Sequence, residues 1–213
     1  MRRLFFLLTL VAVAWADRPV SAQGIYVQSG TGVSVSYARA TASATIFGRR
    51  FTSSTDAVSA AVEAVSQRTQ VAVGVSYSRP FSGVDLYGLS VNVGYLALHQ
   101  HGGDAATLAL NGGLGATVAT GEGLTDTLTP FVVLGPELGV AFPVGPGVEI
   151  VPSGTVALAV PVAVEGASTS TAFGGAVGLS IRSGAARLVF QPGYAVTDGV
   201  STISFSVKAF SRR

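Results

Sequence analysis

A strict alternation of apolar residues with small or polar ones constrains the fold of this chain more than any other feature. From Val71 to Ser78 every second residue is apolar and those between are Ala, Gly or Ser, and residues 87–95 repeat this pattern. Successive side chains of a β-strand point to opposite faces, so each segment predicts a strand with one apolar face. The run Pro80-Phe81-Ser82-Gly83 between them has turn composition, which predicts a β-hairpin.

Six further segments carry the same alternation, so the sequence predicts eight strands after residue 70. They span residues 107–118, 128–142, 148–162, 173–182, 187–196 and 202–208. Several links between them have turn composition, namely Gly145-Pro146-Gly147, Ser183-Gly184 and Asp198-Gly199. Successive segments of about ten residues with a period of two are typical of membrane β-barrels.

The region before Gln70 leaves two strand counts open. Residues 24–37 alternate like a strand, with residues 44–51 as a possible partner. In residues 55–67, Val58, Val62 and Val65 have helical spacing. Two added strands give a ten-stranded barrel, whereas an N-terminal extension leaves eight. Single-chain bacterial barrels have even strand numbers, and we expect ten, with eight as the alternative.

The composition indicates that much of the surface faces lipid. Charged residues make up 11% of the chain, against about 25% in soluble proteins. Beyond the N-terminus, no apolar stretch reaches the roughly 18 residues of a membrane-spanning helix. Only helices and closed barrels satisfy their backbone hydrogen bonds in lipid. The sequence therefore predicts an all-β fold, a closed, antiparallel, up-and-down transmembrane barrel.

The N-terminus has the three parts of a secretory signal peptide. Arg2 and Arg3 precede an apolar run over residues 4–16, and small-residue cleavage sites end at Ala16 and Ala22. We expect a signal peptide at 1–22 and an outer-membrane barrel domain at 23–213, exported to the outer membrane of a Gram-negative cell. The chain has no cysteine, which excludes disulfides, a lipoprotein anchor and thiolate metal sites.

From Gly24 to Phe210 the pattern resembles the small outer-membrane barrels of the OmpA/OmpX type. That resemblance implies contact with outer-membrane lipid, insertion by the barrel-assembly machinery with periplasmic chaperones, and a monomer. Members usually end on an outward-facing aromatic residue. Here Phe210 has the opposite parity to Phe205, and Ser211-Arg212-Arg213 follow it.

Charged residues on the small-residue faces of the strands are the candidate functional site. Strands of a closed barrel face one another across the lumen, and a charge in a narrow lumen must be paired or hydrated. We predict one lumenal cluster of charged and amide side chains. Its members are Glu137, Glu149, Arg182, Arg187, Lys208, Asn92, Asn111 and Gln191. Such a cluster fits either a structural barrel or a narrow pore with a charge-paired lumen.

Other chemistry is weakly represented. His99 and His101 lie in one polar link with Asp104, too few ligands for a metal site. The sequence predicts no metal, no cofactor and no catalytic residue. It also predicts no nucleic-acid partner, because the basic residues form no aromatic-interleaved patch. Two alternatives stay open: an exported soluble β-sandwich that binds a partner, and an outer-membrane lipid-modifying enzyme, which would need one of the histidines.

Prolines inside the proposed strands are the main difficulty for a barrel. A proline removes one hydrogen-bond donor from the ladder, and a closed barrel has no edge at which to place it. We therefore expect these prolines near strand ends or at bulges. They are Pro130, Pro136, Pro152, Pro161 and Pro192.

Overall fold

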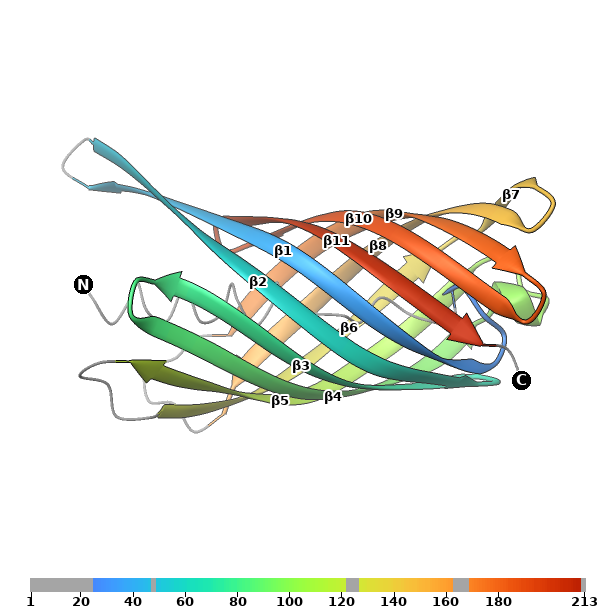
Figure 1. Ribbon diagram of the computed structural model, residues 1–213, viewed down its shortest axis with the longest axis horizontal. Coiled ribbons are helices and arrows are strands. Elements are labelled where there is room, and N and C mark those ends of the chain that lie inside the picture. The colour runs from blue at the N-terminus through green and yellow to red at the C-terminus, as the bar shows by residue number, and fades with distance from the viewer. Residues whose placement is uncertain (1–24, 47–48, 122–126, 163–168, 212–213) are drawn as a thin grey trace.

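A computed structural model describes residues 25–46, 49–121, 127–162 and 169–211 as a barrel of long, tilted strands (Figure 1). The strands are β1 (Gly30–Ile46), β2 (Arg49–Ser66), β3 (Thr69–Phe81), β4 (Val84–Leu98), β5 (Thr107–Gly121), β6 (Thr127–Gly139), β7 (Phe142–Gly145), β8 (Val148–Pro161), β9 (Ser170–Ser183), β10 (Ala186–Thr197) and β11 (Val200–Ser211). One short 3₁₀ helix, η2 (Gln100–Gly102), lies in the link between β4 and β5. The predicted signal peptide lies outside the described residues.

The sheet closes on itself through two pairings. Consecutive strands other than β6 and β7 pair antiparallel, β1 pairs with β11, and β6 pairs with β8. The short β7 pairs with the first residues of β8. β6 and β7 therefore occupy one strand position of the wall, one after the other. The eleven labelled strands thus fill ten strand positions, which will be called staves. The predicted closed, antiparallel, up-and-down barrel with ten strands is confirmed. The eight-stranded alternative and the β-sandwich are wrong.

The region before residue 70 differs from the prediction in its details. The helical spacing of the valines in residues 55–67 does not mark a helix, because this segment belongs to β2. Residues 44–51 do not form a separate partner strand, since residues 44–46 end β1 and residues 49–51 begin β2. Val58 and Val62, four residues apart, share the outer face of the strand, while Val65 faces the lumen and is buried. Small residues separate these valines, so a spacing of four fitted a helix and a strand equally. The predicted strand at residues 24–37 begins only at Gly30 and runs to Ile46.

The two faces of the barrel wall differ as the alternation predicts. On the outer face, valine, leucine, isoleucine and tyrosine side chains are exposed along every long strand. Small residues such as Ser34, Ser36, Ala38 and Ala40 fill the lumen side. An apolar outer band is what a barrel presents to lipid. None of the described helices is long and apolar enough to span a membrane.

Only some of the prolines lie where expected. Pro161 ends β8, and Pro130 and Pro152 lie just outside the paired stretch of β6 and β8. Pro136 and Pro192 are inside their strands, and the pairing resumes beyond each in unchanged register. The expectation is therefore wrong for these two. The barrel tolerates a local gap in the ladder there, between β6 and β8 and between β9 and β10.

Candidate functional site: the plugged end of the barrel

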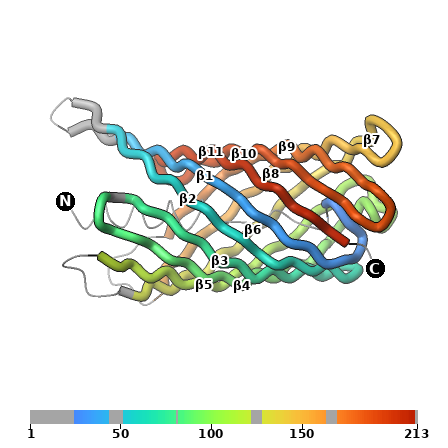
Figure 2. Tube along the Cα trace, viewed as in Figure 1, coloured from blue at the N-terminus to red at the C-terminus, as the bar shows by residue number. Residues whose placement is uncertain are grey.

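The segment that precedes β1 enters the barrel instead of joining its wall. Residues 25–29 will be called the N-terminal plug. Ile25, Tyr26 and Val27 are almost completely buried, with exposed fractions of 1%, 0% and 6%. They form one apolar core with residues from seven staves of the wall: Val65, Leu96, Ala109, Ala141, Val151, Val189 and Phe210. Figure 2 shows the start of the described chain, in blue, at the same end as the C-terminal end of β11. This end is the plugged end, and the opposite one is the far end.

Two glycines in the wall make room for the plug. A Cβ atom on Gly139 would lie 2.6 Å from Cδ1 of Ile25, and one on Gly178 would lie 2.5 Å from the hydroxyl oxygen of Tyr26. Real Cβ atoms do not approach other heavy atoms so closely. The absence of a side chain at these positions therefore forms a socket for each plug residue.

Phe210 completes this core, which explains why it alternates with the lumenal residues of β11 and not with the outer ones. It faces the lumen with an exposed fraction of 3%, as its position in the alternation indicated. Its ring lies over Gly32, to which it is directly paired across β1 and β11. The last aromatic residue of the chain therefore packs against the plugged core instead of facing lipid.

The link between β4 and β5 ties the plug to the wall. His99 Nε2 lies 3.2 Å from the carbonyl oxygen of Val27, and His101 Nε2 lies 2.9 Å from that of Ile25. Between them, Gln100 makes two hydrogen bonds to the backbone of Ala141, of 2.9 and 2.6 Å. Each histidine donates its Nε2 hydrogen to a carbonyl, so both are structural tethers. In the described chain no three potential ligands come together to hold a metal ion.

Burial sets the charge state of one tether. It lowers the pKa of His101 below its usual value, although the nearby carboxylate of Glu149 acts in the opposite direction. The positive charge of Arg187 also lowers this pKa. The imidazole of His101 is therefore mainly neutral at neutral pH, and it gains a charge in an unfavourable site when the pH falls.

Three ionisable side chains are buried behind the plug. Lys208, Glu63 and Glu137 have exposed fractions of 1%, 1% and 4%. Lys208 Nζ lies 5.6 Å from the centre of the Tyr26 ring, a cation–π contact. The Ser34 hydroxyl donates to Glu63 Oε1 at 2.6 Å. These ionisable groups lie around Tyr26, which is fully buried.

The predicted lumenal cluster is therefore divided. Lys208 and Glu137 belong to the buried group, together with Glu63, which the sequence reasoning missed. Glu63 has the lumenal parity of β2, but the helical spacing of the neighbouring valines obscured that parity in the sequence. Glu149 and Arg187 form a second group at the plugged end, with a 2.5 Å ion pair that is supported by Ser180 at 3.0 Å.

Arg182 does not belong to either group, which corrects the prediction. Its side chain is exposed, and its Nε donates to the carbonyl of Gly184 at 3.4 Å. Glu149 is paired directly with Ser180, and Arg182 is paired with Arg187. Both arginines therefore lie one step beyond Glu149 in the register, and the carboxylate of Glu149 bonds Arg187.

The predicted amides lie on the lumenal face in separate contacts. Gln70 Nε2 donates to Asn111 Oδ1 at 2.7 Å, reaching across Gly94, where a Cβ would collide with both. Asn92 fills the space over Gly113, its direct partner on β5. Gln191 is buried and accepts a long hydrogen bond of 3.5 Å from the Ser206 hydroxyl.

The fold of the wall is similar to that of solved outer-membrane β-barrels. No protein-family model matches the sequence, and no curated protein matches it. Among solved structures, the β domain of the Bordetella autotransporter BrkA aligns with a TM-score of 0.50 and 13% identity, over 88% of this chain and 100% of that one. The translocator domain of the autotransporter NalP from Neisseria meningitidis aligns at 0.49 and 11%, over 100% and 96%. At these identities the likeness concerns the fold alone.

Proposed function

We propose that this protein is a narrow pore of the bacterial outer membrane that its own N-terminal plug closes. The chain would be exported through a cleaved signal peptide and inserted by the barrel-assembly machinery, as a monomer in contact with outer-membrane lipid. The apolar outer face and the ten closed staves support this location. A membership in the OmpA/OmpX type stays part of the proposal.

The polar groups around the plug carry the proposal. The hydroxyl of Tyr26 and Oε2 of Glu63 are buried without a hydrogen-bond partner among the described residues. A buried unsatisfied polar group costs about 1–3 kcal/mol, and ionisable residues inside a membrane barrel are themselves expensive. In a core that never opens, apolar side chains in place of the Tyr26 hydroxyl and the Glu63 carboxyl would avoid this cost. A plug that leaves would hydrate both of them and open a lumen lined by Glu63, Glu137 and Lys208.

The proposal includes no enzymatic activity. A lipid-modifying enzyme would need one of the two histidines as a base or acid. The Nε2 atoms of both His99 and His101 are bonded to carbonyls of the plug, which favours a role as tethers.

A disulfide lock tests the pore. The two γ-carbons of Ile25, either of which marks a possible Sγ position of a cysteine at residue 25, lie 3.0 and 3.1 Å from the position of a Cβ on Gly139, near enough for an S–S bond to a cysteine sulfur at residue 139. The chain has no native cysteine among its residues, so the pair Ile25→Cys and Gly139→Cys reacts only with itself. In planar bilayers we expect channel openings after reduction and none after oxidation, with both single-cysteine variants insensitive to redox state.

Two other results would count against the proposal. Equal conductance in the oxidised and reduced pair would show that the plug does not gate the lumen. No conductance under any condition would favour a purely structural barrel. Folding is checked beforehand by electrophoresis in SDS, where a membrane barrel changes mobility only after boiling.

A further inference from the structure

Two arginines of like charge face each other at the plugged end. Arg182 on β9 and Arg187 on β10 are direct partners in the antiparallel register. Like charges directly opposite one another destabilise a sheet. Glu149 neutralises Arg187, but Arg182 forms no ion pair with a described carboxylate. The local charge is therefore incompletely balanced.

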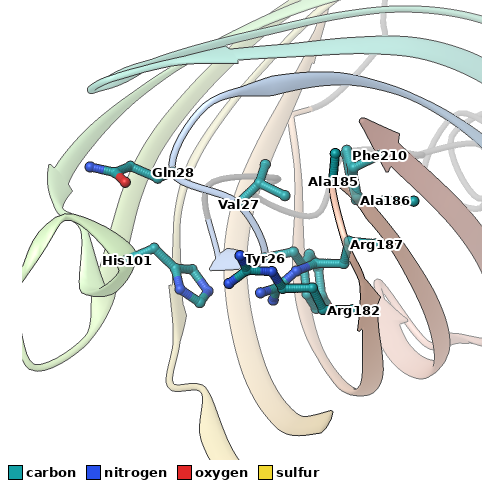
Figure 3. Close-up of a pocket in the computed structure, with 9 residues that line it drawn as sticks. All are labelled: Tyr26, Val27, Gln28, His101, Arg182, Ala185, Ala186, Arg187 and Phe210. Carbon is teal, nitrogen blue, oxygen red and sulfur yellow. The ribbon is translucent and has the colours of Figure 1, made fainter. Parts of the chain in front are cut away.

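A cavity of about 220 Å³ lies at these arginines. It is also lined by His101, Tyr26 and Phe210, so its inner wall is the plugged core. Figure 3 shows Arg182 and Arg187 extending to the same side of this cavity, with the ring of His101 facing them. Because Arg182 is exposed, the cavity is reached from the compartment at the plugged end.

The guanidinium groups keep donors available. Both hydrogen bonds of Arg187 to described residues start from Nη1, and the single one of Arg182 starts from Nε. The Nη2 groups of both therefore bond no described residue. One arginine satisfies a carboxylate through a two-pronged contact, whereas a tetrahedral phosphate has enough oxygens to bind two guanidinium groups together.

We propose that this cavity is a phosphate-binding site formed by Arg182 and Arg187. The bound group is either inorganic phosphate from the adjoining compartment or the phosphate of an anionic lipid headgroup in the adjacent leaflet. A volume of about 220 Å³ suits a group of this size and is too small for a typical drug-sized ligand. The site does not depend on whether the barrel conducts.

Isothermal titration calorimetry of the full folded protein in a non-ionic detergent tests the site. One arm titrates inorganic phosphate, and the other titrates phosphatidylglycerol in mixed micelles without free phosphate. Binding in the first arm identifies the free anion as sufficient, and binding in the second arm alone identifies the headgroup. The absence of binding in both arms overturns the proposal.

Variants locate the binding. We expect Arg182→Gln to weaken binding at least about tenfold, since it removes a charge-assisted contact. Arg182→Lys keeps the charge without the planar fork and should bind with intermediate affinity. The control is Arg79→Gln at the far end, where Arg79 pairs with Asp85 at 2.7 Å on the outer face. Arg182→Gln binding as tightly as this control refutes the site.

Discussion

Adding one methyl group at the Tyr26 socket should release the plug. In Gly178→Ala, the new Cβ would lie 2.5 Å from the hydroxyl oxygen of Tyr26, 2.9 Å from Cε1 and 3.1 Å from Cζ. The ring is fully buried, so it has to leave its position. Overpacking of this kind costs about 1–3 kcal/mol, which lowers the docking equilibrium about 5- to 150-fold.

Cysteine labelling measures this equilibrium. The variant Ile25→Cys places the only thiol at a plug position with an exposed fraction of 1%. A maleimide reaches this thiol when the plug leaves, so the labelling rate follows the undocked fraction. Because Ile25 packs on Gly139, whereas the atoms nearest to a Cβ on Gly178 all belong to Tyr26, the probe leaves the contact under test in place. We expect Gly178→Ala to increase the rate by the factor given above.

A matched control separates the socket from the substitution itself. Gly175→Ala makes the same change on the same strand, but its Cβ would meet only the carbonyl oxygen of Ser153 at an ordinary 3.5 Å. Its labelling rate should equal that of the parent. If Gly178→Ala and Gly175→Ala label equally fast, the socket does not hold Tyr26 and the reasoning is refuted.

Three other substitutions test the remaining contacts of the lumen. Lys208→Met removes the buried cation beside Glu63 and Glu137 and should lower the free energy of unfolding by about 3–5 kcal/mol in urea titrations; an unchanged midpoint would contradict the buried charge group. The pKa of His101 is lowered by burial, so its stabilising effect is present above its usual pKa of about 6.5 and is lost as the pH falls. The labelling rate of the plug, divided at each pH by the labelling rate of the unfolded chain to correct for the loss of thiolate, should therefore increase on acidification. His101→Gln should flatten that profile, whereas an equally steep profile would exclude His101. Gly94→Ala collides with the Gln–Asn pair above it and should cost about 1–3 kcal/mol of stability in the same urea titrations; full stability would show that this pair can move aside.

The wall of the barrel could be predicted because alternation is a local property. In each strand after residue 70, the alternation of apolar and small residues alone indicates which face meets lipid. Turn sequences mark most of the strand ends. The pairing of Glu149 with Arg187, two strands away, is not a local property. It depends on how β8, β9 and β10 align, and a single strand contains no information on that alignment.

The plug could not be predicted for a related reason. Ile25 and Val27 continue the alternation of Val33 and Val35, so the pattern treats them as one strand. Whether such a segment pairs in the wall or enters the lumen depends on the sockets at Gly139 and Gly178, more than 100 positions away. The sequence places the two histidines in a polar link, but it does not indicate that they bond carbonyl oxygens of the plug, which is more than 70 residues away.

The position of Tyr26 is the most direct test of a self-plugged barrel. Solution NMR of the protein in micelles, deuterated except at tyrosine and glycine, would show contacts between the Tyr26 ring and individual glycine α-protons. We predict a strong cross-peak to Gly178, because the Tyr26 hydroxyl oxygen and Cε1 lie 2.5 and 2.9 Å from the site of its missing Cβ. A Tyr26 ring with cross-peaks only to water or detergent would contradict the plug.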